Sequence, residues 1–281
     1  MSNISLRDFR VIIFDCYGTL CDWESGICTA LEPLLKRFPS SAIWTRREAL
    51  LAFTEVEKNL QTKDPTMLYR DLLTKAHAVL ADGLQGQETP NSLSKNSADE
   101  HAEFGASIKE WPIFPDTCDA LRVLEKHYKL VILSNVDHAS FAYTHAKLSD
   151  DTAAALTVYS RPASDSRTQW LPQTTPSSRS PFSLILTAQD TGAYKPDPQG
   201  MLSALDIIQK EFGVGKDKVL VVAQSLYHDI DPSSKLGVNG VWIDRQGANM
   251  GLETIGEAPK WRKRYATLGE MAGAVEAEGK L

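Results

Sequence analysis

The feature of this sequence that most limits its fold is a set of apolar runs that alternate with helical patterns. The runs occupy residues 10–15, 129–133, 184–187, 218–223 and 240–243. Short continuous apolar runs are typical of parallel strands buried on both faces, and strands that alternate with helices favour a doubly wound sheet. We therefore expect an α/β fold built around a parallel sheet.

Polar side chains follow the first four of these runs. In doubly wound sheets, ligands bind beyond the carboxyl ends of the strands, where such side chains would meet in one crevice. The residues that this rule brings together are Asp15, Ser134, Asn135, Lys195, Gln224, Ser225 and Asp229. We predict that they form the functional site.

A long helical stretch separates the first run from the second. Residues 27–38, 45–61 and 66–82 carry apolar side chains at three- and four-residue spacing, which indicates amphipathic helices. A polar loop at 84–99 and a short helix at 100–109 follow, and the pattern predicts an inserted helical domain that covers the crevice. A second irregular stretch at 160–181, rich in Ser, Thr and Pro, predicts a long surface loop.

Charge and composition exclude several classes of protein. The net charge is −6, without a basic block that could neutralise a run of phosphates, so we expect no nucleic-acid partner. No apolar run is long enough to cross a membrane or to form a signal peptide, which favours a cytoplasmic protein. The 4 cysteines show no CxxC spacing, so we expect free thiols and no zinc site.

The segment around Asp15 carries the clearest chemical signal. Asp15 ends the first apolar run and is followed by Gly18 and Thr19, a pattern that places a carboxylate in a tight turn. Such a carboxylate can act as a nucleophile. An aspartate that only caps the turn is the structural alternative.

Residues 14–22 (FDCYGTLCD) resemble the first motif of the haloacid dehalogenase superfamily. In that motif the nucleophilic aspartate is followed, two residues later, by Asp in most phosphatases and by Tyr in the L-2-haloacid dehalogenases; here it is Tyr17. The phosphatase aspartate protonates a leaving alcohol, and such help is typically worth about 10²–10⁴ in rate. Halide leaves without a proton, so Tyr17 favours the dehalogenases.

The other motifs of the superfamily follow in the expected order. Residues 133–135 (LSN) resemble the second, residues 194–197 (YKPD) the third, and residues 225–229 the fourth. The resemblance covers roughly residues 10–245. It implies a Rossmann-like core at 1–21 and 112–281 and a helical cap domain at 22–111.

The resemblance also implies a mechanism and a role for each motif residue. Asp15 would attack the carbon that bears the halogen, and water would then cleave the resulting aspartyl ester. Lys195 would keep Asp15 ionised, Thr19 would orient it, and Asp229 would steer or activate the water. The substrate-binding residues would be Tyr17, Ser134 and Asn135.

Family dehalogenases also use an arginine of the cap to receive the halide. Arg46 and Arg47 lie at about the right distance after Asp15, and we predict Arg47 for this role because the helical face that follows it resembles that of the family. A solvated surface charge is the alternative for either residue.

Two positions depart from the dehalogenase pattern. Leu226 stands where the family has Asn in a Ser-Ser-Asn segment, and Met201 stands where a Tyr follows the lysine of the third motif. These changes leave three hypotheses open. The chain is a cofactor-independent 2-haloacid dehalogenase, a Mg²⁺-dependent phosphatase with Asp15 and Asp229 as metal ligands, or a retired member that only binds a ligand.

The leading hypothesis is a hydrolase that acts on the carbon–halide bond of a small 2-halo acid. The expected partner is therefore a small-molecule acid, with no membrane partner, and the resemblance leaves a homodimer open.

Overall fold

The computed structural model describes residues 4–86, 98–149, 170–174, 178–245, 247–251 and 260–279. Its centre is one parallel sheet with the strand order β3-β2-β1-β4-β5-β6. The strands are β1 (Val11–Phe14), β2 (Lys129–Ser134), β3 (Phe182–Thr187), β4 (Val219–Ala223), β5 (Asn239–Ile243) and β6 (Lys263–Tyr265). This is the strand order of a doubly wound fold, whose order reverses between β1 and β4.

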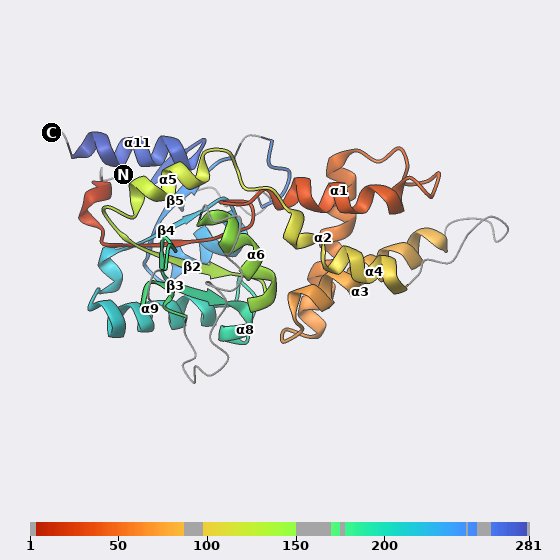
Figure 1. The fold of residues 1–281 in the computed structure, drawn as a ribbon, viewed down its shortest axis with the longest axis horizontal. Helices are drawn as coiled ribbons and strands as arrows, with labels where there is room; N and C mark the ends of the chain where they lie inside the picture. The colour runs from red at the N-terminus through yellow and green to blue at the C-terminus, as the bar shows by residue number, and fades with distance from the viewer. Residues whose placement is uncertain are drawn as a thin grey trace.

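Helices follow most of the strands and cover both faces of the sheet (Figure 1). They are α5 (Thr117–Leu124), α6 (His138–Leu148), α8 (Ala188–Thr191), α9 (Pro198–Phe212), α10 (Asp231–Lys235) and α11 (Leu268–Glu278). Residues of β1 contribute to the packing on both sides, because Ile12 and Phe14 join one apolar cluster while Val11 and Ile13 join another. The predicted α/β class with a doubly wound parallel sheet is confirmed.

The first five strands fall at the five apolar runs of the sequence, with shifts of one or two residues at their ends. The sixth strand, β6, was not predicted. Its sequence is Lys263-Arg264-Tyr265 and its residues are at least partly exposed, so it lacks the apolar signal of a buried strand. It pairs with β5 at the edge of the sheet.

The first four of the α-helices between β1 and β2 lie together, away from the sheet (Figure 1). They are α1 (Trp23–Leu35), α2 (Arg46–Lys63), α3 (Tyr69–Gln85) and α4 (Ala98–Gly105). Their starts follow local rules: the Asp22 side chain accepts the Ser25 N–H, and Thr45 and Glu48 form a capping box. We call α1–α4 the helical insertion.

The two stretches that the sequence predicts to be loops, 84–99 and 160–181, are only partly described by the structure. Most of the predicted 84–99 loop lies outside the described residues, although α3 continues through Gln85 and α4 begins at Ala98. Most of the 160–181 stretch also lies outside them. Where it is described it is not simply a surface loop, because Trp170 is buried and forms a bridge with Ile185 of β3.

The helical insertion is joined to the core by hydrogen bonds at several points. Tyr194 donates to the carbonyl of Met67 at 2.7 Å, and the carboxylate of Asp137 accepts the N–H of Arg70 at 3.0 Å. On another side, Glu24 accepts from the backbone N–H groups of Asn249 and Met250. No helix among the described residues is long and apolar enough to cross a membrane.

Candidate active site

Asp15 is held at the carboxyl end of β1 by a tight turn. The carbonyl of Cys16 accepts the N–H groups of Thr19 and Leu20, and Gly18 has a φ of 103°, a conformation that favours glycine. The turn brings the Thr19 hydroxyl back to donate to Asp15 Oδ2 at 2.8 Å. Thr19 in turn accepts the N–H of Gln224 at 2.9 Å, so the turn after β1 is tied to the end of β4.

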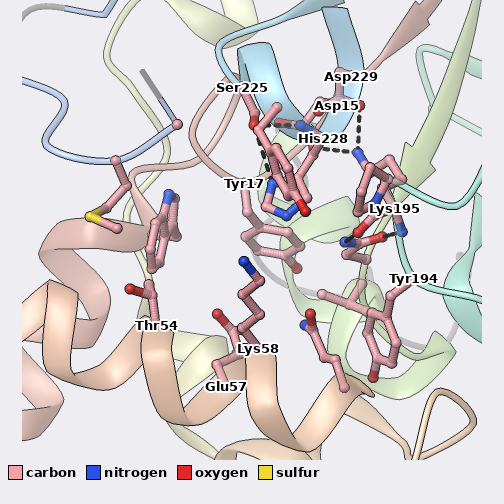
Figure 2. A pocket seen from close by; sticks show the side chains of 18 of the residues that line it. Asp15, Tyr17, Thr54, Glu57, Lys58, Tyr194, Lys195, Ser225, His228 and Asp229 are labelled. Carbon is pink, nitrogen blue, oxygen red and sulfur yellow. Dashed lines mark hydrogen bonds and ion pairs between the residues drawn. The ribbon is translucent and has the colours of Figure 1, made fainter. Parts of the chain in front are cut away.

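Lys195 connects the two buried carboxylates of the site. Its Nζ donates to Asp15 Oδ1 at 2.7 Å, to Asp229 Oδ1 at 2.8 Å and to the carbonyl of Leu133 at 3.0 Å. These bonds account for all three N–H groups of the ammonium. Figure 2 shows the Lys195 ammonium beside Asp15 and Asp229, on the side of the cavity that faces α2.

Asn135 fixes the loop that carries Lys195. Its Oδ1 accepts the N–H of Lys195 at 2.7 Å, and its Nδ2 donates to the Lys195 carbonyl at 3.1 Å. The pair of bonds positions the backbone of Lys195 relative to the end of β2. Asn135 therefore positions Lys195, in addition to lining the cavity.

The charges in this cluster do not balance, since two carboxylates share one ammonium. Burial alone would lower the pKa of Lys195, but Asp15 and Asp229 raise it above its ordinary value. Burial raises the pKa of Asp229 to about 7, with a further contribution from the charge of Asp15. Asp229 Oδ2 has no hydrogen-bond partner among the described residues. Asp229 is thus a carboxyl group whose pKa burial holds above its ordinary value, and its Oδ2 is available to a ligand or to water.

Tyr17 lies in the cavity as a neutral phenol. Burial raises its pKa well above 10, and its hydroxyl shares a hydrogen bond of 2.8 Å with Thr144 Oγ1. Its ring meets the indole of Trp111 edge-on, with 5.5 Å between the ring centroids. Tyr17 can therefore contact a ligand, but it offers no carboxylic acid to protonate a leaving group.

His228 is a residue of the site to which the sequence analysis assigned no role. It lies in a π-helical turn, Leu226–Ile230, and its Nδ1 is 3.2 Å from the hydroxyl of Ser225. Burial lowers the pKa of His228 to about 4, and the charge of Lys195 contributes to the shift. A neutral imidazole therefore lines the cavity beside Asp229. The sequence signal that could have identified His228 as a residue of the site is its position shortly after the fourth apolar run.

A cavity of about 1020 Å³ connects these residues to the helical insertion. The core contributes Asp15, Tyr17, Asn135, Lys195 and Asp229 to its wall, and α2 contributes much of the opposite wall (Figure 2). The structure therefore brings together the predicted residues that follow β1, β2, β3 and β4. It also places α2 over them.

Two other predicted residues lie behind the cavity wall. Thr19 is fully buried beneath Asp15, which suits a residue that orients the carboxylate. Ser134 is 1% exposed at the end of β2, and its hydroxyl has no hydrogen-bond partner in the part of the chain that is described. A buried hydroxyl without a partner is costly, so a bound group that supplied one would be stabilised there.

Arg47 is not brought together with the other predicted residues. It is exposed at the start of α2, does not line the cavity, and donates to the carbonyl of Asn249 at 3.1 Å. Arg46 also turns away and lies 3.6 Å from the carboxylates of Asp22 and Glu24. The physical reason is the docking of α2, which presents its middle to the cavity and its first turn to the segment around Asn249.

The two departures from the dehalogenase pattern lie in the apolar packing. Met201 on α9 is 4% exposed and packs below the sheet with residues of β1 and β3. Leu226 is 3% exposed and packs with Ile230 and Trp242. Neither residue lines the cavity, so each fills space in the core instead of adding a polar group to the site.

A divalent metal would find two acidic side chains here. Among the described residues, no group of three or more His, Cys, Asp and Glu side chains is arranged to hold a metal ion. Mg²⁺ is nevertheless commonly held by one or two carboxylates together with water and a substrate phosphate. Asp15 and Asp229 could supply those carboxylates, and the oxygen of Asp229 that lacks a hydrogen bond fits such a role.

Residues 9–231 of this chain match the family model of the haloacid dehalogenase-like hydrolases. The match covers all four segments that form the cavity wall of the core. A search of curated proteins found no match.

Solved structures with the same fold cover nearly the whole chain. The L-2-haloacid dehalogenase PA0810 matches with a TM-score of 0.62 and 20% identity, covering 94% of this chain and 98% of that one. The L-2-haloacid dehalogenase from Xanthobacter autotrophicus matches with a TM-score of 0.62 and 16% identity, over 95% and 98%. YfnB from Bacillus subtilis, bound to magnesium, matches with a TM-score of 0.62 and 13% identity, over 95% and 99%. At these identities the likeness is one of fold.

Proposed function

Because this chain belongs to the haloacid dehalogenase-like hydrolase family, we propose that it cleaves the carbon–halogen bond of a 2-halo acid with Asp15 as the nucleophile. The observation that carries the proposal is Tyr17, a neutral phenol at the position where a phosphatase of this family would need a carboxylic acid. Halide leaves without a proton, so a site of this composition suits it.

In the first step, an oxygen of Asp15 attacks the carbon that bears the halogen. The new carbon–oxygen bond forms as the carbon–halogen bond breaks, and the halide departs with the electron pair. Lys195 and Thr19 hold the two oxygens of Asp15 in position through bonds of 2.7 and 2.8 Å. Holding the nucleophile in a near-attack geometry lowers the entropic part of the barrier.

In the second step, water attacks the carbonyl carbon of the aspartyl ester, and Asp229 accepts its proton. The bond between the ester carbonyl carbon and the substrate oxygen then breaks, and the alkoxide takes the proton from Asp229 and leaves as a 2-hydroxy acid. Asp15 is regenerated with one oxygen from the water, and the second proton of the water passes to solvent. Asp229 suits this role because burial places its pKa at about 7 and its Oδ2 has no other partner in the described structure.

The carboxylate of the substrate would bind at the end of β2. The hydroxyl of Ser134 lacks a partner there, and Nδ2 of Asn135 has a second N–H beyond the one it donates to Lys195. A carboxylate accepts hydrogen bonds only, so Asn135, which lines the cavity, could donate to it directly, and Ser134 could do so if the carboxylate reached behind the cavity wall.

The second candidate is a Mg²⁺-dependent phosphatase, which the free oxygen of Asp229 favours. Asp15 and Asp229 would hold the metal, which would offset the charge of a bound phosphate. Tyr17 is the argument against this function, because phosphate-ester cleavage would then lack its usual acid.

The two candidates are separated by one pair of assays. Purified protein is incubated with L-2-chloropropionate or a monohaloacetate, with and without EDTA, and released halide is measured beside phosphate release from an aryl phosphate. Halide release that is insensitive to EDTA is the expected result. Phosphate release that EDTA abolishes, without any halide release, would establish the phosphatase instead.

A further inference from the structure

One side of α2 forms a continuous part of the cavity wall. Its members follow one another at helical spacing, and we call them the α2 stripe: Leu51, Thr54, Glu55, Lys58, Gln61 and Thr62. The opposite side of α2 is buried within the helical insertion through Leu50, Phe53 and Leu60, and the ring of Phe53 packs against Phe104 of α4. The stripe begins with an apolar side chain and continues with one acid, Glu55, one cation, Lys58, and hydrogen-bonding groups, and Glu57 of α2 also lines the cavity beside it.

Lys58 is the cation that the helical insertion directs into the cavity. It follows Arg47 by about three turns, so both lie on nearly the same side of α2, but Lys58 is about 16 Å further along. Figure 2 shows its side chain rising from α2 toward the catalytic residues. Its Nζ lies 5.6 Å from the centroid of the Tyr227 ring, within the range of a cation–π contact.

Lys58 forms no ion pair within the described ranges, although two carboxyl groups are near it in sequence. Glu55 lines the cavity one turn earlier and makes no salt bridge to Lys58. Glu57 accepts the Tyr69 hydroxyl at 2.9 Å, and burial raises its pKa to about 7. The ammonium is thus left for a ligand to pair with.

The volume of the cavity is much larger than that of the short 2-halo acids considered as substrates above. A three-carbon 2-halo acid has about six non-hydrogen atoms, and at about 30 Å³ each it fills at most about 180 Å³. The cavity holds about 1020 Å³, so most of it, including the α2 stripe, would stay unfilled. A site of this size is typical for a ligand of many more atoms.

We propose that Lys58 binds a second carboxylate of the substrate, so that the preferred substrate is a 2-substituted dicarboxylic acid instead of a short monoacid. The reacting carbon lies at Asp15, and the distal carboxylate pairs with Lys58 across the cavity. This inference rests on the proposed function for the reacting end but concerns a different part of the cavity.

The test is binding of unreactive acids, which needs no turnover. Succinate, glutarate and adipate are titrated by calorimetry at low salt into the wild-type protein and into Lys58→Met, with propionate and butyrate as monoacids. We expect at least one diacid to bind more tightly than the monoacids, and Lys58→Met to weaken that diacid by about tenfold while leaving the monoacids unchanged. Lys58→Arg should restore most of the affinity.

Lys63 provides the matched control, since it is a lysine on the same helix that does not line the cavity. Lys63→Met should leave every affinity unchanged, and equal melting temperatures would show that both variants fold. An unchanged diacid affinity in Lys58→Met, or an equal loss for monoacids and diacids, would overturn the inference.

The binding experiment distinguishes a failure of the Lys58 inference from a failure of the proposed function. Halide release from L-2-chloropropionate without a Lys58-dependent preference for diacids would support the dehalogenase and overturn this inference. Lys58-dependent diacid binding without halide release from any 2-chloro monoacid or diacid would support the anion site and refute the dehalogenase.

Discussion

Lys195 forms ion pairs with two buried carboxylates, and this makes it the residue whose loss should affect both stability and activity. Removing one partner of a buried ion pair typically costs about 3–5 kcal/mol, because the remaining charge stays buried. We expect Lys195→Met to abolish halide release and to lower the free energy of unfolding by an amount in that range. Urea unfolding measures the second effect.

The loss of stability in Lys195→Met should be smaller in acid. Without the ammonium, Asp15 and Asp229 can avoid two buried charges by binding a proton. Proton binding is more favourable at about pH 5 than at about pH 8. A stability difference between variant and wild type that is independent of pH would show that the two carboxylates do not depend on Lys195.

Asp229 sets the expected pH dependence of the second chemical step. Its pKa is raised to about 7, so its proton-accepting form predominates above that pH and is lost below it. In the ester Asp15 carries no charge and Lys195 pairs with Asp229 alone, so the pKa of Asp229 that governs ester breakdown should lie below that of the free enzyme, and the rate constant should fall by about tenfold per pH unit below that pKa. The decay of the ester in single-turnover experiments between about pH 5.5 and about pH 8.5 measures this rate constant. In Asp229→Asn the decay should be slow at every pH. A flat wild-type profile would exclude Asp229 as the base.

The sequence allowed the position of Asp15, Lys195 and Asp229 to be predicted, because each follows an apolar run and parallel strands end at one edge of the sheet. Lys58 could not be predicted in the same way. Which residues of α2 face the cavity depends on how the helical insertion docks on the core, and that is fixed by distant contacts such as Tyr194 with Met67. The same docking explains why Arg47 lies elsewhere.

At the scale of elements, α1 and the segment that returns to the core meet at Gly26. A Cβ at this position would overlap the ring of Trp111, which also meets the ring of Tyr17 in the cavity. We expect Gly26→Ala to destabilise the protein by about 1–3 kcal/mol and to alter halide release through the displaced Trp111. Thermal unfolding and initial rates measure the two effects.

Gly83 on α3 provides the control for this substitution. A Cβ there would meet no atom within 4 Å, so Gly83→Ala should stabilise the helix by about 0.5–1 kcal/mol without changing the rate. Equal effects of the two substitutions would mean that the contact of Gly26 with Trp111 has no influence on stability.

The elements of the fold were predictable to the extent that their signal was local. The five buried strands and α1, α2 and α3 carry their periodicity within their own residues. The edge strand β6 does not, because its pairing with β5 alone defines it as a strand. Trp170 likewise gave no local signal, and its burial comes from contact with β3.

On the scale of the whole molecule, the cavity between core and helical insertion decides what the chain can act on. The core supplies the reacting groups, and the insertion supplies the wall that a substrate must match. Membership of the family identifies the chain as a hydrolase. The solved structures that share 13–20% identity with this chain show the fold alone.

The measurement that most directly tests the central claim is the fate of water oxygen. The protein turns over a 2-chloro acid in H₂¹⁸O, and the peptide that contains Asp15 is then analysed by mass spectrometry. If Asp15 forms an ester with carbon and water attacks its carbonyl, ¹⁸O enters the Asp15 carboxylate, and Asp15→Asn releases no halide. Halide release that leaves Asp15 without ¹⁸O would contradict the proposed mechanism, because the water oxygen would then have gone directly to the substrate.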